Sequence, residues 1–358
     1  MPPSNTSQIL LSPAELSYLH SSLSLSPPIR PDGRTPTQFR PLVAESGILP
    51  SANGSARICF GDGTEAIVGV KAEVEKSIVR PGLLDDEDVS SEEEEETEEG
   101  AGEGEDSWTE ISIEVPDFRD DDALPIFLAA MLTEALLADG KLKDRLCINR
   151  RFHWKLYIDI LLLSTPLSYP LPLLSLTTHL ALLSTRLPSL KSEGDEDPLF
   201  NDDWEESVYL YPFTPTGNRL SRPPITLLVM SIGTNYIFDP SKEELAVAEA
   251  VVAISVGSTE SEGKGNMDLK LLALRTIDPP SRLTTPGIPN SLNNVATGDR
   301  PLPPDEAFAA REGTEEKGVW NPPRGGMKRG VLAAILKAVV KKGGIGEEVM
   351  EGLLGVEL

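Results

Sequence analysis

Hydrophobic and polar residues alternate from residue 40 to residue 75, with a break at Gly61-Asp62-Gly63. Alternation of period two predicts strands with one buried face, and a glycine-flanked break between two such runs predicts a tight turn. This segment is therefore expected to form a β-hairpin. A further strand is predicted from Trp108 to Val115. The apolar positions of the hairpin are Ala56, Ile58 and Phe60 before the turn, and Ala66, Val68, Val70, Ala72 and Val74 after it.

Two segments, 123–139 and 171–187, are apolar on most faces of a helix. Helices that are hydrophobic all round are buried, so both are expected in the core. The first is expected to end at Gly140, and the second has Pro170 and Pro172 at its start, where proline is tolerated.

The ends of the chain predict amphipathic helices. Ser12, Pro13 and Glu15 form a helix start in which Ser12 caps and Glu15 bonds back, and Leu16, Leu19 and Leu23 follow as one stripe. This helix would dock either on its own domain or on a partner. Residues 326–342 predict a second, basic-ended helix.

The rest of the chain predicts a second set of strands. Residues 154–163 are expected to form a central strand that is apolar on both faces. Strands and helices then alternate in two similar halves, so the fold class is α+β, with sheets covered by helices. The remaining strands are predicted at 207–213, 224–232, 235–238 and 267–275.

Composition shifts divide the chain into four parts. The main folded domain spans residues 30–276 and consists of two repeats. The full division is an N-terminal helix and linker at 1–29, repeats at 30–145 and 146–276, a low-order linker at 277–322, and a C-terminal helix at 323–358.

Charge is distributed very unevenly over the 358 residues, whose net charge is −25. Residues 85–106 contain 14 acids and no base, and residues 193–206 contain eight acids and no base. Like charges at this density repel one another and cannot be buried. We therefore expect a disordered acidic insertion at about 83–107 and an acidic loop at 191–206, on a nearly neutral body.

Several classes of protein are excluded by composition. Two cysteines and three scattered histidines build neither a disulfide framework nor a metal centre, so no metal and no cofactor are expected. No lysine or arginine precedes Arg30, which is unlike a signal or transit peptide, and the apolar stretches are too short to span a membrane. A soluble intracellular protein without membrane contact is expected.

Two clusters of cations are the candidate functional sites. The first contains Arg30, Arg34 and Arg40, for which we expect a structural role, as internal pairing with carboxylates at a domain or subunit interface. The second lies in residues 145–155 and contains Arg150, Arg151 and Lys155, interleaved with Phe152 and Trp154. Cations beside aromatic rings suit phosphate contact and base stacking in single-stranded RNA, and internal pairing is the alternative. No nucleotide-binding loop or catalytic triad accompanies either cluster.

Several short motifs occur in a characteristic order over residues 10–280. They are R-P-D-G-R at 30–34, S-A-N-G-S-A-R-I-C-F-G-D-G-T-E-A-I-V-G-V-K-A-E-V at 51–74, L-C-I-N-R at 146–150, L-Y-I-D-I-L-L-L at 156–163 and I-F-D-P-S-K-E-E-L at 237–245. Their order and spacing resemble ribonuclease PH-type domains, and in particular the ring subunits of the eukaryotic RNA exosome. This resemblance implies a ribonuclease PH-like fold of two β-α repeats over residues 30–276.

The same resemblance implies that this chain has no catalytic activity. Active relatives have a D-x-D/E…A-D-x-G-[ST]-R segment, in which carboxylates assist protonation of the leaving ribose oxygen and the last residues bind phosphate. Here Asp159 is retained, but Leu161 and Pro166 replace the other acids, and Pro170 replaces the arginine. Phosphorolysis needs an anion site that holds the phosphate and a proton donor for the leaving ribose oxygen, and this segment is expected to supply neither.

Three functions follow as hypotheses. The chain is a non-catalytic subunit of the exosome ring, which forms an RNA channel for 3′-5′ RNA processing and decay, including rRNA maturation and mRNA turnover. Alternatively it is an active phosphorolytic 3′-5′ exoribonuclease, or an acidic chaperone that binds basic proteins through residues 85–106.

The first hypothesis implies partners. These are ring neighbours of the mRNA transport regulator type and the ribosomal RNA-processing protein 41 type, S1/KH cap subunits, an associated hydrolytic exoribonuclease, and single-stranded RNA. It also implies a location in the nucleus, the nucleolus and the cytoplasm.

Overall fold

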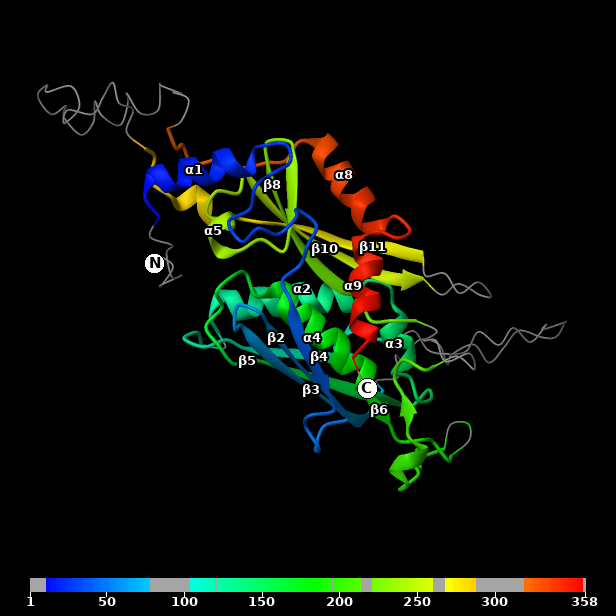
Figure 1. The fold of residues 1–358 in the computed structure, drawn as a ribbon. Helices are drawn as coiled ribbons and strands as arrows, with labels where there is room; N and C mark the ends of the chain where they lie inside the picture. Colours follow the sequence, from blue (N-terminus) through cyan, green and yellow to red (C-terminus); the bar gives the residue numbers. More distant parts are fainter. Residues whose placement is uncertain are drawn as a thin grey trace, which may run out of the picture.

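Two β-sheets lie on either side of a layer of helices in the computed structural model (Figure 1). The described residues are 11–77, 104–119, 121–192, 194, 196–213, 221–259, 268–287 and 319–356. Most of the predicted acidic insertion at 83–107 lies outside this set, as do residues 288–318 of the predicted linker.

The first sheet contains the predicted hairpin, β2 (Gly54–Phe60) and β3 (Glu65–Lys76), whose strands are antiparallel. Its strand order is β1-β2-β3-β5-β4, with β1 spanning Leu42–Ser46 and β4 spanning Thr109–Glu114. The predicted strand before the first buried helix is therefore confirmed as β4, which runs parallel to β5.

Strand β5 (Phe152–Leu162) corrects two predictions. It pairs with β3 and β4, so it belongs to the first sheet, although the boundary at residue 145 assigned it to the second repeat. In addition, only one face of β5 is buried. Ile158 and Ile160 lie on the buried face, whereas Asp159 and Leu161 lie on the exposed face. The sheet to which a strand belongs depends on its pairing with strands far apart in the sequence. The periodicity of one strand therefore does not predict it.

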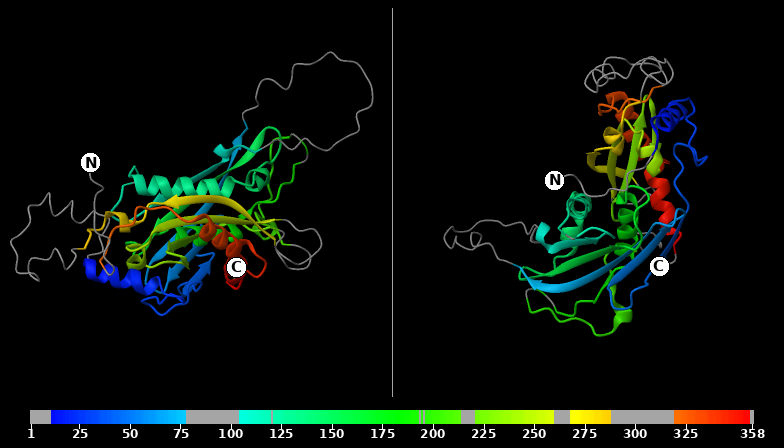
Figure 2. Two further views of the ribbon diagram at one scale, coloured as in Figure 1. Left: turned by 90° about the horizontal axis from the view of Figure 1, so that it is seen from above. Right: turned by 90° about the vertical axis from the view of Figure 1, so that its left-hand side faces the viewer.

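The second sheet has the order β11-β10-β8-β9 and is antiparallel throughout. All eight residues of β8 are buried, because helices cover both faces of this sheet (Figure 2). Sheet one, in contrast, has one face open to solvent. The bounds are β8 Ile225–Ile232, β9 Asn235–Phe238, β10 Ala250–Thr259 and β11 Asp268–Ile277, and a separate two-stranded ribbon pairs β6 (Arg186–Leu187) with β7 (Val208–Tyr209).

The two predicted buried helices, α2 (Ala123–Leu137) and α4 (Leu171–Ser184), form the layer between the sheets. Helix α4 contacts β2 and β3 on one side and β8 on the other. Every residue of α4 from Leu171 to Leu183 is buried, as expected for a helix that is apolar on all faces. A short helix, α3 (Lys141–Arg145), follows Gly140, which has a positive φ.

The N-terminal helix, α1 (Pro13–Leu23), has the predicted capping box between Ser12 and Glu15. Its residues Leu16 and Leu23 are buried in the main core, so α1 docks on its own domain. The short helix α5 (Lys242–Leu245) follows β9 and begins with a second capping box.

The C-terminal region differs from the single helix that was predicted. It forms two helices, α8 (Arg329–Val340) and α9 (Ile345–Leu354), separated by a turn in which Gly343 has a positive φ. The described ends of the predicted low-order linker are also ordered, since Ser281 and Trp320 are buried. Short 3₁₀ turns lie at Asp106–Trp108, Trp204–Glu206 and Pro280–Leu283.

Within the described residues, no helix is both long and apolar enough to cross a bilayer, and no three metal-binding side chains gather in one place.

Candidate functional site

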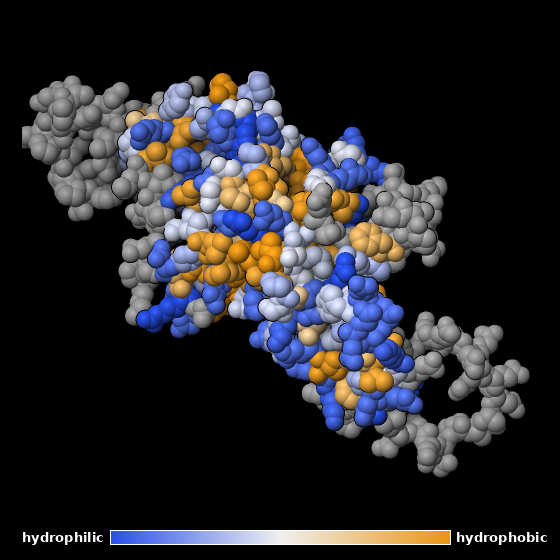
Figure 3. Space-filling model, turned by 60° about the horizontal axis from the view of Figure 1, so that its bottom comes forward, coloured by the Kyte–Doolittle hydropathy of each residue, from blue (hydrophilic) through white to orange (hydrophobic). Residues whose placement is uncertain are grey.

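The segment that would hold the catalytic groups of an active relative connects β5 to α4. Asp159 and Leu161 lie on the exposed face of the first sheet, because their neighbours Ile158, Ile160 and Leu162 point toward α4. Exposed leucines continue along this segment at Leu163 and Leu167. Figure 3, which brings the bottom of the molecule forward, shows hydrophobic residues gathered among hydrophilic ones on this side.

The N-terminus of α4 is poorly suited to bind an anion. Helix N-termini attract anions because their first backbone N–H groups are unpaired and carry the positive end of the helix dipole. Pro170 is the N-cap of α4 and Pro172 lies in its first turn, and proline has no N–H group. Pro170 is also buried. The position at which the resemblance expects an arginine therefore offers neither a cation nor a backbone donor.

The other polar groups of this segment are already engaged. Burial raises the pKa of Tyr169 to about 12, so its hydroxyl stays protonated near neutral pH. The Ser168 hydroxyl accepts a hydrogen bond of 2.8 Å from Arg40, and the Ser164 hydroxyl accepts one of 3.0 Å from the N–H of Glu65. Of the expected acids, Asp159 remains, with hydrophobic residues in place of the others.

The first cation cluster, Arg30, Arg34 and Arg40, pairs with two carboxylates beyond the end of the second sheet, Asp239 directly after β9 and Glu244 in α5. Arg30 donates two hydrogen bonds to Glu244, of 2.7 and 2.8 Å, and both side chains are fully buried. It also donates to the carbonyl oxygens of Phe238 and Asp239. A planar guanidinium opposite a carboxylate in this two-bond arrangement is the strongest common form of ion pair.

Asp239 receives the other two arginines. Its carboxylate accepts a 2.8 Å bond from Arg34 and a 2.6 Å bond from Arg40. Asp239 is 2% exposed and has a φ of 47°, a conformation that aspartate adopts more readily than most residues. Arg40 also reaches Asp62, at 2.5 Å, in the turn of the first sheet. The cluster therefore joins the two sheets, which is the internal pairing expected from the sequence.

These contacts explain the pKa shifts in the cluster. Burial lowers the pKa of Arg40, but hydrogen bonds and charge from Asp239 and Asp62 outweigh it, and the net shift is upward. Burial likewise raises the pKa of Asp62, but the bond from the N–H of Thr64 and the charge of Arg40 outweigh it, and the net shift is downward. Each group is held in its charged form by its partners.

Sequence reasoning missed Glu244 and Asp239 as partners of the arginines. They lie more than 200 positions from Arg30 in the chain. One signal was available, because Ser241 and Glu244 have capping-box spacing, and Glu244 fills that role while also pairing with Arg30.

The second cluster forms the turn before β5, and the structure changes its interpretation. Phe152 and Trp154 are 9% and 8% exposed, so they are core residues and present no ring surface to a base. Trp154 packs on Phe200 with ring centroids 4.9 Å apart. Arg145, at the start of the cluster, donates to the carbonyl of Leu210 and lies over the Tyr211 ring.

The three candidate RNA contacts of this cluster are placed differently. Arg150 and Arg151 are exposed, and Arg151 pairs with Asp197 of the acidic loop at 2.7 Å. The ammonium group of Lys155 donates to the carbonyl of Ser107 at 2.6 Å and lies 3.5 Å from Glu110. Lys155 is thus tied to the edge of the first sheet.

The buried pair yields a prediction. Replacing Arg30 by Met leaves the Glu244 carboxylate buried without a partner, which costs about 3–5 kcal/mol of unfolding free energy. Urea denaturation measures the change. As a matched control, Arg57→Met removes a partly exposed arginine that pairs with Glu65 on the surface of the first sheet and is expected to leave the midpoint nearly unchanged. Equal midpoints for Arg30→Met and wild type would contradict a stabilising role for the pair.

The sequence was compared with family models and with known proteins. A model of the 3′ exoribonuclease family, domain 1, matches residues 38–188. Exosome complex component RRP42 of Saccharomyces cerevisiae is 31% identical over 270 residues, which cover 74% of this chain and 86% of that protein. Exosome complex component rrp42 of Schizosaccharomyces pombe is 33% identical over 262 residues, which cover 69% of this chain and 78% of that protein.

Solved structures with a similar chain include "Archaeal exosome core", at 20% identity and a TM-score of 0.47, covering 74% of this chain and 84% of that chain. Another is the Archaeoglobus fulgidus exosome with RNA bound to the active site, at 21% identity and a TM-score of 0.48, covering 74% and 87%. The similarity to the curated proteins decides the family: the chain belongs to the ribonuclease PH family, among the exosome components of the RRP42 type.

Proposed function

We propose that this chain is a non-catalytic subunit of an exosome ring, where it contributes to the wall of an RNA channel used in 3′-5′ RNA processing and decay. Its curated relatives bear the name exosome complex component, which supports the assembly. The absence of catalysis is supported by one observation above all: Pro170 and Pro172 stand at the start of α4, where an active relative would bind phosphate.

Phosphorolysis needs three things from the protein. It must hold the attacking phosphate, supply a proton to the leaving ribose oxygen, and stabilise the charge that develops between them. At the start of α4 this chain offers prolines in place of N–H donors, and Arg40 is occupied by Asp239, Asp62 and Ser168. Asp159 alone replaces neither the phosphate site nor the second acid.

The proposed partners follow from the same assignment. We expect ring neighbours of the mRNA transport regulator type and the ribosomal RNA-processing protein 41 type, S1/KH cap subunits, and an associated hydrolytic exoribonuclease that performs the cleavage. The proposed location is the nucleus, the nucleolus and the cytoplasm, where such an assembly would process rRNA and degrade mRNA.

The test is an assay of the purified chain with single-stranded RNA, magnesium and inorganic phosphate, with an active ribonuclease PH as the positive control. Nucleoside diphosphates are expected in the control only, because this chain cannot position phosphate. Release of nucleoside diphosphates above a buffer blank, in proportion to the amount of the chain, would overturn the claim that it is inert.

For RNA contact in the assembled ring, the proposal is confined to Arg150 and Arg151. Both are exposed at the turn before β5, and the Arg151 side chain is 51% exposed beside Asp197. The Lys155 side chain is 16% exposed and donates to Ser107, and the aromatic rings beside the arginines are buried. Such arginines contact phosphates and stack no bases, so binding through them would depend strongly on salt and little on sequence.

A double substitution, Arg150→Ala with Arg151→Ala, is expected to weaken RNA binding by the assembled ring. The slope of log affinity against log salt should become shallower by about 0.7 for each phosphate that the variant no longer neutralises. Lys155→Ala is the matched control and should leave the slope unchanged. If the ring does not assemble with the double variant, the two arginines are interface residues; if assembly and affinity both stay normal, the turn plays no part in RNA binding.

A further inference from the structure

A basic strip near the C-terminus stands apart from the rest of this acidic chain. Residues 319–342 contain six cations and no acid, in a protein whose net charge is −25. We define the strip as Arg324, Lys328, Arg329, Lys337 and Lys341. All five are exposed. The sixth cation, Lys342, is left out because it pairs with Asp268 at 2.9 Å.

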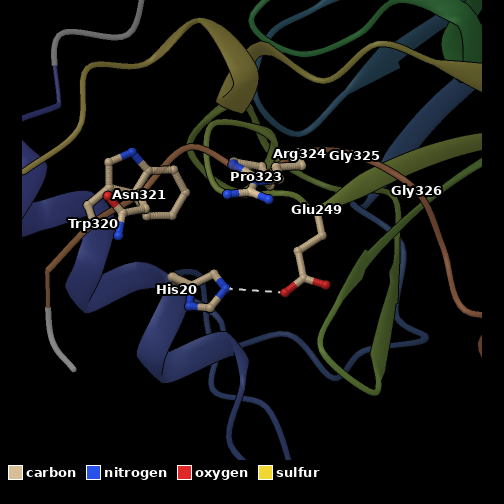
Figure 4. A pocket seen from close by; sticks show the side chains of 8 residues that line it. All are labelled: His20, Glu249, Trp320, Asn321, Pro323, Arg324, Gly325 and Gly326. Atoms are coloured by element: carbon tan, nitrogen blue, oxygen red, sulfur yellow. Dashed lines mark ion pairs between the residues drawn. The ribbon is translucent and has the colours of Figure 1, made fainter. Parts of the chain in front are cut away.

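The strip has a fixed backbone. Trp320 is 4% exposed, and its indole N–H donates to the Thr284 hydroxyl, which anchors the start of the segment. The chain then passes α1 beside a cavity of about 290 Å³, where Arg324 lies near His20 and Glu249 (Figure 4). It continues into α8, which lies on the second sheet at the top of the molecule (Figure 1).

Within α8 the cations occupy one side. Ile335 and Val339 are buried and face the body of the protein. At 100° per residue, Arg329, Lys337 and Lys341 fall within about a third of a turn on the opposite side. Arg329 and Lys341 are twelve residues apart, which corresponds to about 18 Å along the helix axis. Together with Arg324 and Lys328, they form an extended row and not a single point of charge.

In the part of the chain that the structure describes, acids do not pair with the cations of the strip. Among the described residues, no carboxylate lies within ion-pair distance of any of the five cations. The charge of one of them, Lys328, acts on Glu249. Its pKa is lowered first by the hydrogen bond from His20 and to a smaller degree by the charge of Lys328. The His20 contact, at 3.5 Å, already occupies that carboxylate.

Two of the cations lie at the N-terminus of α8, where a positive charge destabilises the helix. Lys328 is the N-cap of α8 and Arg329 its first residue, and the first turn contains no acid. The N-terminal end of a helix carries partial positive charge, so cations there are unfavourable and acids are favourable. Helix stability therefore does not account for Lys328 and Arg329, whereas binding of an anion would.

We propose that this basic strip binds the phosphodiester backbone of single-stranded RNA on the outer surface of the subunit. A row of unneutralised cations matches a chain of regularly spaced phosphates better than it matches one small anion. Trp320 is buried and its N–H is used, so base stacking takes no part and the contact is independent of sequence. The choice of RNA over another polyanion rests on the proposed function; the existence of an anionic ligand rests on the geometry alone.

The test uses the assembled complex, whose composition is checked by intact-mass analysis, and a fluorescent oligouridylate of about 30 nucleotides at several salt concentrations. Arg329→Glu is expected to weaken binding about fivefold and to reduce the salt slope by about 0.7, and adding Arg324→Glu should reduce it by about 1.4 in total. Lys71→Glu is the matched control, with the same change of charge on the exposed face of the first sheet.

A purely structural role predicts a different result. Glutamate at position 329 suits the helix dipole, so Arg329→Glu should keep or raise the melting temperature. Weaker RNA binding together with an undiminished melting temperature would therefore support the proposal. Unchanged RNA affinity in the double variant, or an equally weakened affinity in Lys71→Glu, would overturn it.

Other outcomes of this experiment also support or contradict the proposal. If the charge-reversed variants fail to assemble, Arg324→Gln with Arg329→Gln is measured instead, with the same expected change in salt slope. Binding of polyglutamate but not of oligouridylate to the strip would mean an acidic protein partner and would overturn the choice of RNA. Normal assembly of the double variant with unchanged RNA binding would contradict RNA binding by the strip but not the ring function. Failure of the wild-type chain to join a ring would contradict the ring function.

Discussion

The ion pairs of Arg30, Arg34 and Arg40 with Asp239 and Glu244 fix the segment between α1 and β1 on the end of the second sheet. Charges can be buried at this depth only when each is paired and hydrogen bonded. Arg40 extends the network to Asp62 in the β2–β3 turn of the first sheet, so the complete network forms only when both sheets are folded against one another.

This constraint fixes the position of α4 and of the segment before it. Helix α4 is enclosed by β2, β3 and β8, and Arg40 reaches the segment at Ser168 while it holds Asp239 and Asp62. The start of α4 is thus held in place, and it carries Pro170 and Pro172, with Leu161 and Leu163 exposed before it. These residues support the proposal that the chain serves in assembly and not in catalysis.

Much of the fold follows from local patterns in the sequence. Period-two alternation identified the β2–β3 hairpin, and uniformly apolar segments identified α2 and α4. One error concerns information that no local pattern contains, because β5 joins the first sheet through pairing with β3. The other error overlooked a local signal, since Gly343-Gly344 separates α8 from a second helix, α9.

In the candidate sites, too, local sequence predicted some features, and others depend on residues far apart in the chain. The prolines at positions 166 and 170, where the resemblance expects an acid and an arginine, can be read from residue types alone. The role of Arg30 cannot, because its partner Glu244 lies 214 residues away. Phe152 and Trp154 seemed suited to stack bases beside the arginines, but β5 turns both rings into the core, where burial of large apolar side chains is most favourable.

The central claim is that this chain acts as one non-catalytic member of a mixed ring. Native mass spectrometry of the complex purified through a tag on this chain tests it most directly, because the measured mass gives both the identity and the number of subunits. The account predicts a single copy of this chain together with different ribonuclease PH-type subunits. A free monomer, or a ring built from copies of this chain alone, would contradict it.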